Sequence, residues 1–589
     1  MSGLRPPLRV LLGLAVAFGV ATGLFEVGLR SESRLGLAFT EQLQWLGISA
    51  LISSGFLVVA ALVAWAIGRR CFGLLFSALL FVHCALIYRI DFMVNRGMRE
   101  LVVWGGWLLI GAACLTFGLL VDRFILKNLR SILVVLLGIS VVGVSMTLVR
   151  SSGDTGLERN DQKNVLLVTL DTTRPDHLSA YGYEISTPAI QRLATEGVVF
   201  EEAVTTAPLT EPSHLAILTG NPPIRTGIVS NGTDLGAQPD MLTRRLQEEG
   251  WSTAAFVSAY PLHARYGWDQ SFHVYDDDFG VFPGLHRLNL VQAWDQMLRM
   301  NTLRERRGDH TVGRALHWLE QHHEEPFFLW VHLYDPHAPY EAPDHPFEPP
   351  TEGERLDLPS HWPARHQAIT STEWLTEAYD AEIRYVDGQV ERLLDRLDAL
   401  DLTSSTIVML TSDHGESLTE HDYLFDHGDK LYDPSLLVPW IVRGPGVIEG
   451  ERVEGCQVSN MDVAPTLLTM LGIVDDADRL GVDRTPELYG EACRSVPVIA
   501  TTIAGRWETE PPIDHALRSE GYKWILHEEE TPECYGLESD PDEVLPLGED
   551  CPEWLSTQLE AALEFGADPQ SVSQDADTRQ ALEALGYVE

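Results

Sequence analysis

Residues 164–182 read Asn-Val-Leu-Leu-Val-Thr-Leu-Asp-Thr-Thr-Arg-Pro-Asp-His-Leu-Ser-Ala-Tyr-Gly and place a carboxylate directly after an apolar run. The run from Val165 to Leu170 is short and contains β-branched residues, which is typical of a buried parallel strand. In open α/β sheets, ligand sites lie beyond the carboxyl ends of such strands. We therefore expect Asp171, the next residue, to lie where a metal or a substrate is held.

The same pattern occurs twice more in the chain. Residues 406–412 are apolar and lead directly into Asp413, His414 and Gly415. Residues 327–333 are also apolar and lead into Asp335-Pro-His337. Three strands that each deliver Asp or His at the same end predict one shared site at that edge of the sheet.

Strand-like and helix-like segments alternate over residues 164–475, which predicts an α/β domain. The helical candidates are residues 187–195, 241–249, 312–322 and 372–400. Residues 340–370 are rich in Pro, Asp and Glu and are expected to form a long loop. From about residue 476 to residue 589, shorter strand-like pieces such as 496–502 and 523–527 predict a smaller α+β subdomain.

The first 150 residues predict an all-α transmembrane region of about five helices, since each apolar run is near the ~20 residues that cross a bilayer. The runs cover roughly residues 10–28, 47–67, 72–88, 102–121 and 131–149. By the positive-inside rule, the arginines place the N-terminus in the cytoplasm. The odd number of spans then predicts an integral protein of the cell's inner membrane, with the catalytic domain outside the cytoplasm. Residues 151–163 are expected to be a linker.

Composition excludes one class of partner and one kind of nucleophile. The net charge of −43, from 85 acidic and 42 basic residues, argues against a nucleic-acid partner. No cysteine lies near the predicted site, which excludes a cysteine nucleophile. Four cysteines lie near the C-terminus, and an even number allows disulfides in an oxidising compartment. These are Cys456, Cys493, Cys534 and Cys551.

A further candidate, Thr210, lies in residues 206–220, which read Thr-Ala-Pro-Leu-Thr-Glu-Pro-Ser-His-Leu-Ala-Ile-Leu-Thr-Gly. Pro212 suits a first helical turn, so Thr210 is expected at or just before a helix N-terminus. Free amide groups and the positive end of the helix dipole would favour an anionic ester beside its hydroxyl. The alternative is that Thr210 only caps the helix.

These segments resemble the sulfatase family of the alkaline phosphatase-like superfamily. The stretches that carry the resemblance are Asp171–Gly182, Thr210–Gly220, Ser412–Glu416, Asp426–Gly428, Val438–Gly446 and Tyr535–Glu543. The resemblance covers about residues 164–589 and implies an alkaline phosphatase-like sandwich with a smaller C-terminal subdomain. It also implies a metal-dependent hydrolase of anionic esters.

The resemblance assigns roles to single residues. It implies that Asp171, Asp413 and His414 hold one divalent metal ion, with Thr210 completing the site. Calcium is the metal favoured in the family, and the histidine at 414 leaves manganese or zinc as alternatives. His337 and His427 match positions that contact the ester oxygens or protonate the leaving group. His214 replaces the usual Arg of the nucleophile signature and is included among the catalytic residues.

Two positions depart from the family pattern. Thr172 stands where many sulfatases have a second Asp ligand. Thr210 stands where typical sulfatases convert Cys or Ser to formylglycine, an aldehyde that Thr cannot form. A threonine ester must be released by attack at sulfur or phosphorus, and that route suits phosphoryl esters.

Two functions therefore remain open. The first is a membrane-bound, sulfatase-like hydrolase of sulfuric or phosphoric esters in which Thr210 attacks the ester. The ester group of its substrate would be attached to a glycan or a lipid head group. The alternative is a phosphoethanolamine- or glycerophosphate-type transferase that acts on envelope lipids or glycans. A degenerate binding protein is disfavoured because the predicted ligands and histidines are intact.

Overall fold

A mixed eight-stranded sheet forms the centre of the molecule. The computed structural model describes residues 163–236, 239–279, 305–359, 362–363, 365–503 and 512–564. The strand β1 (Asn164–Leu170) lies between β5 (Phe327–Leu333) and β6 (Thr406–Ser412), and it is parallel to both. The carboxyl ends of these three strands therefore meet at one edge, as the sequence predicts.

The remaining strands extend the sheet on both sides of this central trio. On one side lie β3 (Ser252–Phe256) and β4 (Val274–Asp276), and on the other lie β7 (Leu437–Arg443), β2 (Val198–Val204) and β8 (Glu451–Ser459). Only β7 runs antiparallel to its neighbours β6 and β2. The predicted α/β class is thus confirmed, with one reversed strand inside the sheet.

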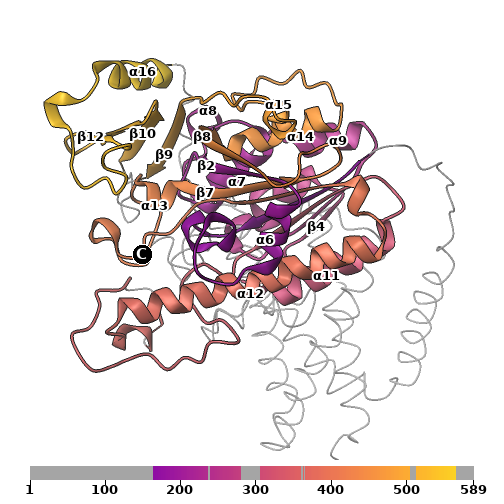
Figure 1. Cartoon of the computed structure of the whole chain (residues 1–589), viewed down its shortest axis with the longest axis horizontal. Coiled ribbons are helices and arrows are strands. Elements are labelled where there is room, and N and C mark those ends of the chain that lie inside the picture. The colour runs from indigo at the N-terminus through magenta and orange to yellow at the C-terminus, as the bar shows by residue number, and fades with distance from the viewer. Residues whose placement is uncertain are drawn as a thin grey trace, which may run out of the picture. The chain divides into compact units, whose positions relative to one another are not determined.

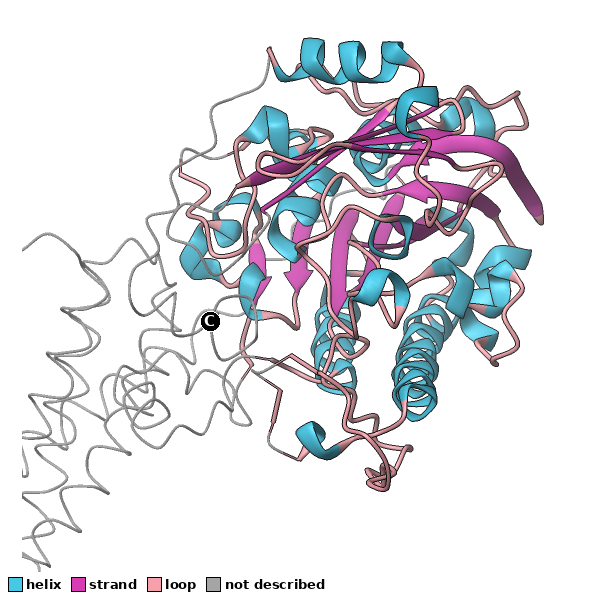
Figure 2. Cartoon of the chain, turned by 90° about the vertical axis from the view of Figure 1, so that its left-hand side faces the viewer, coloured by secondary structure: helices cyan, strands magenta, loops and turns pink. Residues whose placement is uncertain are grey.

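Helices cover both faces of this sheet (Figures 1 and 2). One face is covered by α6 (Pro188–Thr195), α11 (Gly308–His322) and α12 (Thr372–Ala399). The other is covered by α7 (Thr210–Thr219), α9 (Leu242–Glu248) and α14 (Val463–Met470). Three single-turn helices complete this part: α8 (Pro223–Thr226), α13 (Asp433–Leu436) and α15 (Thr485–Leu488).

Burial on both faces explains why most residues of the central strands are apolar. In β1, Val165 and Leu167 pack into the core beneath α7, and Leu166, Val168 and Leu170 pack into the core beneath α12. Successive side chains of a strand point to opposite faces, so a strand covered on both sides has no exposed position for a polar residue. The first carboxylate therefore comes directly after the strand, at Asp171, which is itself buried.

The predicted helices are found at residues 188–195, 242–248 and 372–399, close to the expected limits. Helix α11 begins at Gly308, four residues before the expected start at 312. Its first turn lacks apolar periodicity, but the Asp335 carboxylate accepts hydrogen bonds from the Gly308 amide at 3.0 Å and fixes the turn. Asp335 thus stabilises the N-terminus of α11 and does not join the predicted site.

A second, antiparallel sheet follows the first. Its order is β12 (Glu533–Gly536), β11 (Tyr522–Leu526), β10 (Ile513–Ser519) and β9 (Val498–Ile503), and α16 (Glu553–Leu563) packs against it. These elements lie within the predicted C-terminal subdomain. The limits of the catalytic domain at 164–475 and of the subdomain at 476–589 stay predictions.

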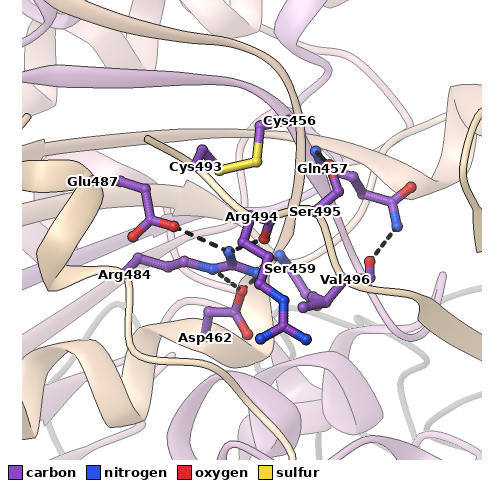
Figure 3. Close-up of a disulfide and its surroundings, with 10 residues drawn as sticks. All are labelled: Cys456, Gln457, Ser459, Asp462, Arg484, Glu487, Cys493, Arg494, Ser495 and Val496. Atoms are coloured by element: carbon purple, nitrogen blue, oxygen red, sulfur yellow. Dashed lines mark hydrogen bonds and ion pairs between the residues drawn. A yellow bond between two sulfur atoms is a disulfide. The ribbon is translucent and has the colours of Figure 1, made fainter. Parts of the chain in front are cut away.

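The four C-terminal cysteines form two disulfides, Cys456–Cys493 and Cys534–Cys551. The first ties the edge strand β8 to the segment after α15 (Figure 3), and the second ties β12 to the residues before α16. The even number of cysteines in this part of the chain allowed such pairs, and the pairing itself follows from the tertiary structure.

The predicted localisation is contradicted. Within the described residues, no helix is both long enough and apolar enough to cross a membrane. This finding contradicts the expectation of an integral inner-membrane protein with its catalytic domain outside the cytoplasm. The five apolar runs between residues 10 and 149, and the linker at 151–163 apart from its last residue, lie outside the described residues.

Candidate active site

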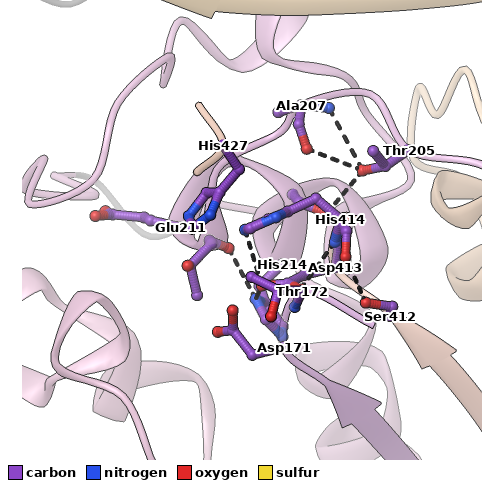
Figure 4. Close-up of polar contacts among 12 residues, drawn as sticks. Asp171, Thr172, Thr205, Ala207, Glu211, His214, Ser412, Asp413, His414 and His427 are labelled. Atoms are coloured by element: carbon purple, nitrogen blue, oxygen red, sulfur yellow. Dashed lines mark hydrogen bonds and ion pairs between the residues drawn. The ribbon is translucent and has the colours of Figure 1, made fainter. Parts of the chain in front are cut away.

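The carboxyl ends of β1 and β6 bring together the three predicted metal ligands. Asp171 follows β1, and Asp413 and His414 follow β6. One oxygen or nitrogen of each lies within 4.8 Å of the others, and all three side chains are buried (Figure 4). Asp171 lies 242 positions before Asp413 in the sequence, and the two converge because β1 and β6 are parallel neighbours.

One atom of each ligand residue has no hydrogen-bond partner among the described residues. These atoms are Asp171 Oδ1, Asp413 Oδ2 and His414 Nε2. Asp413 Oδ1 accepts from the His414 amide at 2.8 Å, and His414 Nδ1 lies 2.9 Å from the Gly415 carbonyl. A carbonyl only accepts, so Nδ1 carries the proton and Nε2 offers a lone pair. Buried acceptors without donors are costly unless a ligand satisfies them, so this donor set fits a divalent cation.

Burial dominates the electrostatics of these carboxyls. It raises the pKa of Asp171 to about 7, against the lowering effects of His414, Asp413 and Thr210. Burial also raises the pKa of Asp413, and the neighbouring Asp171 carboxylate adds to that effect. Two neighbouring buried carboxyls therefore both have raised pKa values. This is expected at a site where a cation would compensate their charges.

Thr210 is the first residue of α7, and the helix is capped by Leu209 in an extended conformation. Thr210 therefore does not act as the N-cap, which was the alternative left open by the sequence. Its hydroxyl is buried and has no hydrogen-bond partner among the described residues, although it is close enough to Asp171 to lower the pKa of that carboxyl. The hydroxyl is thus buried next to the Asp171 carboxyl.

The start of α7 is held by the loop that follows α8. The Glu211 amide donates to Asn231 Oδ1 at 2.8 Å, and Glu211 Oε2 accepts from the Gly232 and Thr233 amides at 2.5 and 3.2 Å. Burial raises the pKa of Glu211 well above its usual range. Figure 4 shows the Glu211 side chain directed away from Asp171 and Asp413. It therefore fixes the backbone beside Thr210 and does not join the cluster of ligands.

The backbone of Asp413 is held from the opposite side of the cluster. Ser213 Oγ donates to the Asp413 carbonyl at 2.6 Å, and Asn460 Nδ2 donates to the same carbonyl at 3.3 Å. Asn460 follows β8, and the segment after it is held by Asp462, whose carboxylate accepts from the buried Arg484 guanidinium at 2.7 Å (Figure 3). Asn460, which follows β8, therefore helps to hold the backbone of a predicted metal ligand.

Close packing explains two unusual residues beside the ligands. A side chain at Gly415 would place its Cβ 2.1 Å from the Pro434 carbonyl oxygen, so only glycine fits there. Thr172 has φ of 49°, which is rare for a β-branched residue and costs conformational energy. Tyr379 from α12 donates to the Thr172 carbonyl at 2.8 Å and holds it in that conformation.

The structure also brings the two predicted ester-contacting histidines to this site. The rings of His337 and His427 lie 4.9 Å apart, and the ring of His427 lies 4.4 Å from that of His414. His427 Nδ1 lies 3.1 Å from Glu416 Oε1, and both residues are buried. A buried carboxylate at this distance orients an imidazole and stabilises its protonated form.

His214 is buried in the core, where its ring lies 4.8 Å from that of His332 and its Nδ1 lies 3.6 Å from Asp413 Oδ2. Its Nδ1 lies 2.7 Å from the Thr210 carbonyl oxygen, and its Nε2 lies 3.0 Å from Thr169 Oγ1. Burial lowers the pKa of His214 to about 3, so the ring is neutral. Its catalytic role stays a prediction, and these contacts favour a role in positioning Thr210 and the nearby Asp413.

Three residues of the site were not assigned from the sequence: His332, Glu416 and Asn460. His332, the sixth residue of β5, lies 3.1 Å through Nε2 from Asp171 Oδ2. A signal for it existed, because a histidine inside the apolar run Phe-Phe-Leu-Trp-Val-His-Leu needs a partner. Glu416 lies within the Ser412–Glu416 signature, whereas Asn460 follows β8 and has no local signal.

Comparison with known proteins agrees with this geometry. The family model named Sulfatase matches residues 163–473. A protein named Sulfatase from Formosa agariphila is 28% identical over 458 residues, which cover 68% of this chain and 86% of that protein. An ulvan-active sulfatase from the same organism is 26% identical over 333 residues, which cover 53% of this chain and 62% of that protein.

Solved structures share the fold. The phosphonate monoester hydrolase of Agrobacterium radiobacter superimposes with a TM-score of 0.54 at 20% identity, covering 69% of this chain and 95% of that one. At this identity the likeness shows the fold alone. The match of the family model over more than half of the chain shows the family, and the chain belongs to the sulfatase family of ester hydrolases.

Proposed function

We propose that this chain is a metal-dependent hydrolase of sulfuric or phosphoric esters in which the Thr210 hydroxyl attacks the ester. Asp171, Asp413, His414 and Thr210 would hold one divalent cation. His337 and His427 would contact the ester oxygens and protonate the leaving alcohol. The observation that carries the proposal is the Thr210 hydroxyl, which is buried at the start of α7 beside Asp171 and has no hydrogen-bond partner in the part of the chain that the structure describes.

The residues divide the chemistry between them. A divalent cation on these atoms would lower the pKa of the Thr210 hydroxyl and neutralise charge on the transferring group. Thr210 Oγ would give its proton to solvent and then bond to sulfur or phosphorus, while the bond from that atom to the leaving oxygen breaks. His427, oriented by Glu416, gives a proton to that oxygen. His427, now neutral, would take a proton from the water that attacks the same sulfur or phosphorus, and the bond to Thr210 Oγ would break.

The donor set bears on the identity of the metal. The family habit predicts calcium, which prefers oxygen ligands only. His414 would add one imidazole nitrogen to the two carboxylates of Asp171 and Asp413. Imidazole is a better ligand for manganese and zinc than for calcium. We therefore place manganese or zinc ahead of calcium for this chain.

The names of the relatives suggest two substrate classes. One matched relative is named an ulvan-active sulfatase, and a structural neighbour is a phosphonate monoester hydrolase. An anionic ester carried by a glycan is consistent with the first name. Direct displacement by threonine is consistent with the second, because phosphorus accepts such an attack readily. A panel of aryl sulfates, phosphate mono- and diesters and phosphonates, assayed with Mn²⁺, Zn²⁺ and Ca²⁺, separates these classes.

The nucleophile is tested by replacing Thr210. Thr210→Ala should reduce kcat by at least about 10³-fold, because no hydroxyl remains to attack. Thr210→Ser keeps a hydroxyl and should retain part of the activity. Mass spectrometry of the wild-type protein quenched during turnover should show a sulfate- or phosphate-sized adduct on the peptide that holds Thr210.

A neighbouring threonine provides the control. Thr206 is also buried with a hydroxyl that lacks a partner among the described residues, but it lies before the helix. Thr206→Ala should therefore keep the adduct and most of the activity. Full activity in Thr210→Ala would remove Thr210 as the nucleophile and leave water as the attacking group.

A further inference from the structure

We propose that His332 is a positioning residue that holds Asp171 so that its Oδ1 faces the cation. The inference rests on the cation site of the proposed function and adds to it a residue outside the ligand set. It also implies that His332 is not a ligand of a second metal, although His214, His332 and Asp413 lie close enough together to hold one.

The partners of the His332 ring fix its proton. The Ser258 amide donates to His332 Nδ1 at 3.4 Å, and an amide nitrogen can only donate. Nδ1 is therefore the acceptor, and the proton lies on Nε2. That nitrogen lies 3.1 Å from Asp171 Oδ2, so the ring donates to the carboxylate. The second carboxylate oxygen, Asp171 Oδ1, has no partner among the described residues and is free to bind the cation.

The ring has no freedom to take another position. His332 is fully buried near the end of β5, in register with Thr169, two residues before Asp171. Side chains at Thr169 and Asp171 share one face of β1, so His332 faces Asp171 across the strand pair. Ser258 is itself held, since its hydroxyl lies 2.7 Å from Thr311 Oγ1 and its carbonyl accepts from the Arg306 amide at 2.9 Å.

A second metal is disfavoured because both histidines already use both ring nitrogens. His214 Nδ1 bonds the Thr210 carbonyl, which only accepts, so this nitrogen carries the proton. Trp330 Nε1 donates to Thr169 Oγ1 at 2.9 Å, which leaves the Thr169 proton for His214 Nε2 at 3.0 Å. His332 Nδ1 accepts from Ser258, and its Nε2 donates to Asp171. Neither imidazole thus offers a lone pair to an ion.

The test is calorimetric titration of metal-free protein with Mn²⁺, without substrate. His332→Asn keeps an amide near the position of Nδ1 but does not reach Asp171, and it should weaken Mn²⁺ binding by about 10–100-fold. His332→Gln places an amide N–H near the position of Nε2 and should bind within a few-fold of wild type. The expected stoichiometry is one Mn²⁺ per chain in all three proteins.

Matched variants separate positioning from loss of fold. His366 is an equally buried histidine in the loop before α12, and His366→Asn should leave Mn²⁺ affinity unchanged. Near-ultraviolet circular dichroism confirms that each variant is folded. If His332→Asn does not fold, a folded His332→Gln that binds 10-fold or more weakly than wild type would overturn the inference, because its donor is retained.

The outcomes distinguish this inference from the proposed function. Asp413→Asn should abolish Mn²⁺ binding. If Asp413→Asn loses Mn²⁺ while His332→Asn binds as tightly as wild type, the inference fails and the cation site stands. If wild-type protein binds no Mn²⁺, Zn²⁺ or Ca²⁺, both fail. Two Mn²⁺ per wild-type chain, falling to one in His332→Asn, would make His332 a ligand.

Discussion

At the scale of single residues, the site is defined by which atoms are satisfied and which are not. His414 illustrates this, since its Nδ1 is bonded to a carbonyl and its Nε2 has no partner among the described residues. The same division holds for Asp413, where backbone amides occupy Oδ1 and leave Oδ2. If these residues bind a cation as proposed, protein groups already orient each of them, which would reduce the free-energy cost of binding it.

The imidazole at 414 leads to a prediction about metal selectivity. His414→Gln places a neutral amide oxygen near the position of Nε2, because the glutamine side chain has the necessary length. Affinity for Zn²⁺ and Mn²⁺ should fall by about 10-fold or more, and affinity for Ca²⁺ should change much less. Competition of each ion with a chromophoric chelator measures this. An equal loss for all three ions would show that His414 does not set the preference.

At the scale of elements, the C-terminal sheet is fastened beside the loop that carries His427. Lys523 of β11 is fully buried and lies 2.5 Å from Asp433 and 2.6 Å from Glu543. Asp433 is the first residue of α13, and its carboxylate also lies 3.3 Å from Arg518 of β10. Lys523 and Arg518 hold the pKa of the Asp433 carboxyl below its usual range, to about 2. The network therefore fixes α13 to the second sheet.

Replacing Lys523, the central positive charge of this network, should strongly destabilise the fold. Lys523→Met leaves two carboxyls buried with less compensation, and the free energy of unfolding should fall by about 3–5 kcal/mol. Urea denaturation of the metal-free protein measures the loss.

Lys163 offers a matched control, because it is half-buried and donates a single hydrogen bond to the Met470 carbonyl at 2.9 Å. Lys163→Met should cost only about 1 kcal/mol. Similar losses in the two variants would mean that the buried network contributes no more than an ordinary hydrogen bond.

At the scale of the whole molecule, two buried carboxyls at the sheet edge couple metal binding to stability and pH. The pKa of Asp171 is raised from about 4 in the unfolded chain to about 7 in the fold, and the pKa of Asp413 is also raised. The unfolded chain therefore loses these protons at lower pH than the folded one. Without metal, the contribution of Asp171 to stability is full below pH 4 and is lost as pH rises through about 7.

A bound cation should reverse this loss, because it requires the ionised carboxylates. The increase in thermal midpoint caused by Mn²⁺ should thus be larger at pH 8 than at pH 5. At pH 8 and 100 times Kd, the stabilisation should be about 2.7 kcal/mol. Differential scanning calorimetry with Mn²⁺ or with a chelator measures both midpoints. Asp413→Asn should show no shift at either pH, and an equal shift at both in wild type would contradict the coupling.

The sequence by itself determined the central strands, the α/β class and the family. Apolar runs followed by Asp171, Asp413 and His337 reveal strand ends because a strand buried on both faces is made mostly of apolar residues. The metal-site candidates follow from the same rule, since parallel strands end at one edge. Their roles remain proposals, but the structure does bring Asp171, Asp413 and His414 within 4.8 Å of one another.

Only the tertiary structure shows which side-chain atoms of the site are hydrogen-bonded and which are left for a ligand. Only neighbours distant in sequence show that His332 donates to Asp171, that Asn460 holds the Asp413 carbonyl, and that Thr210 is not a cap. The start of α11 at Gly308 depends on Asp335 for the same reason. Local sequence encodes periodicity and strand ends, whereas the direction of a buried hydrogen bond depends on partners that only the folded chain brings together.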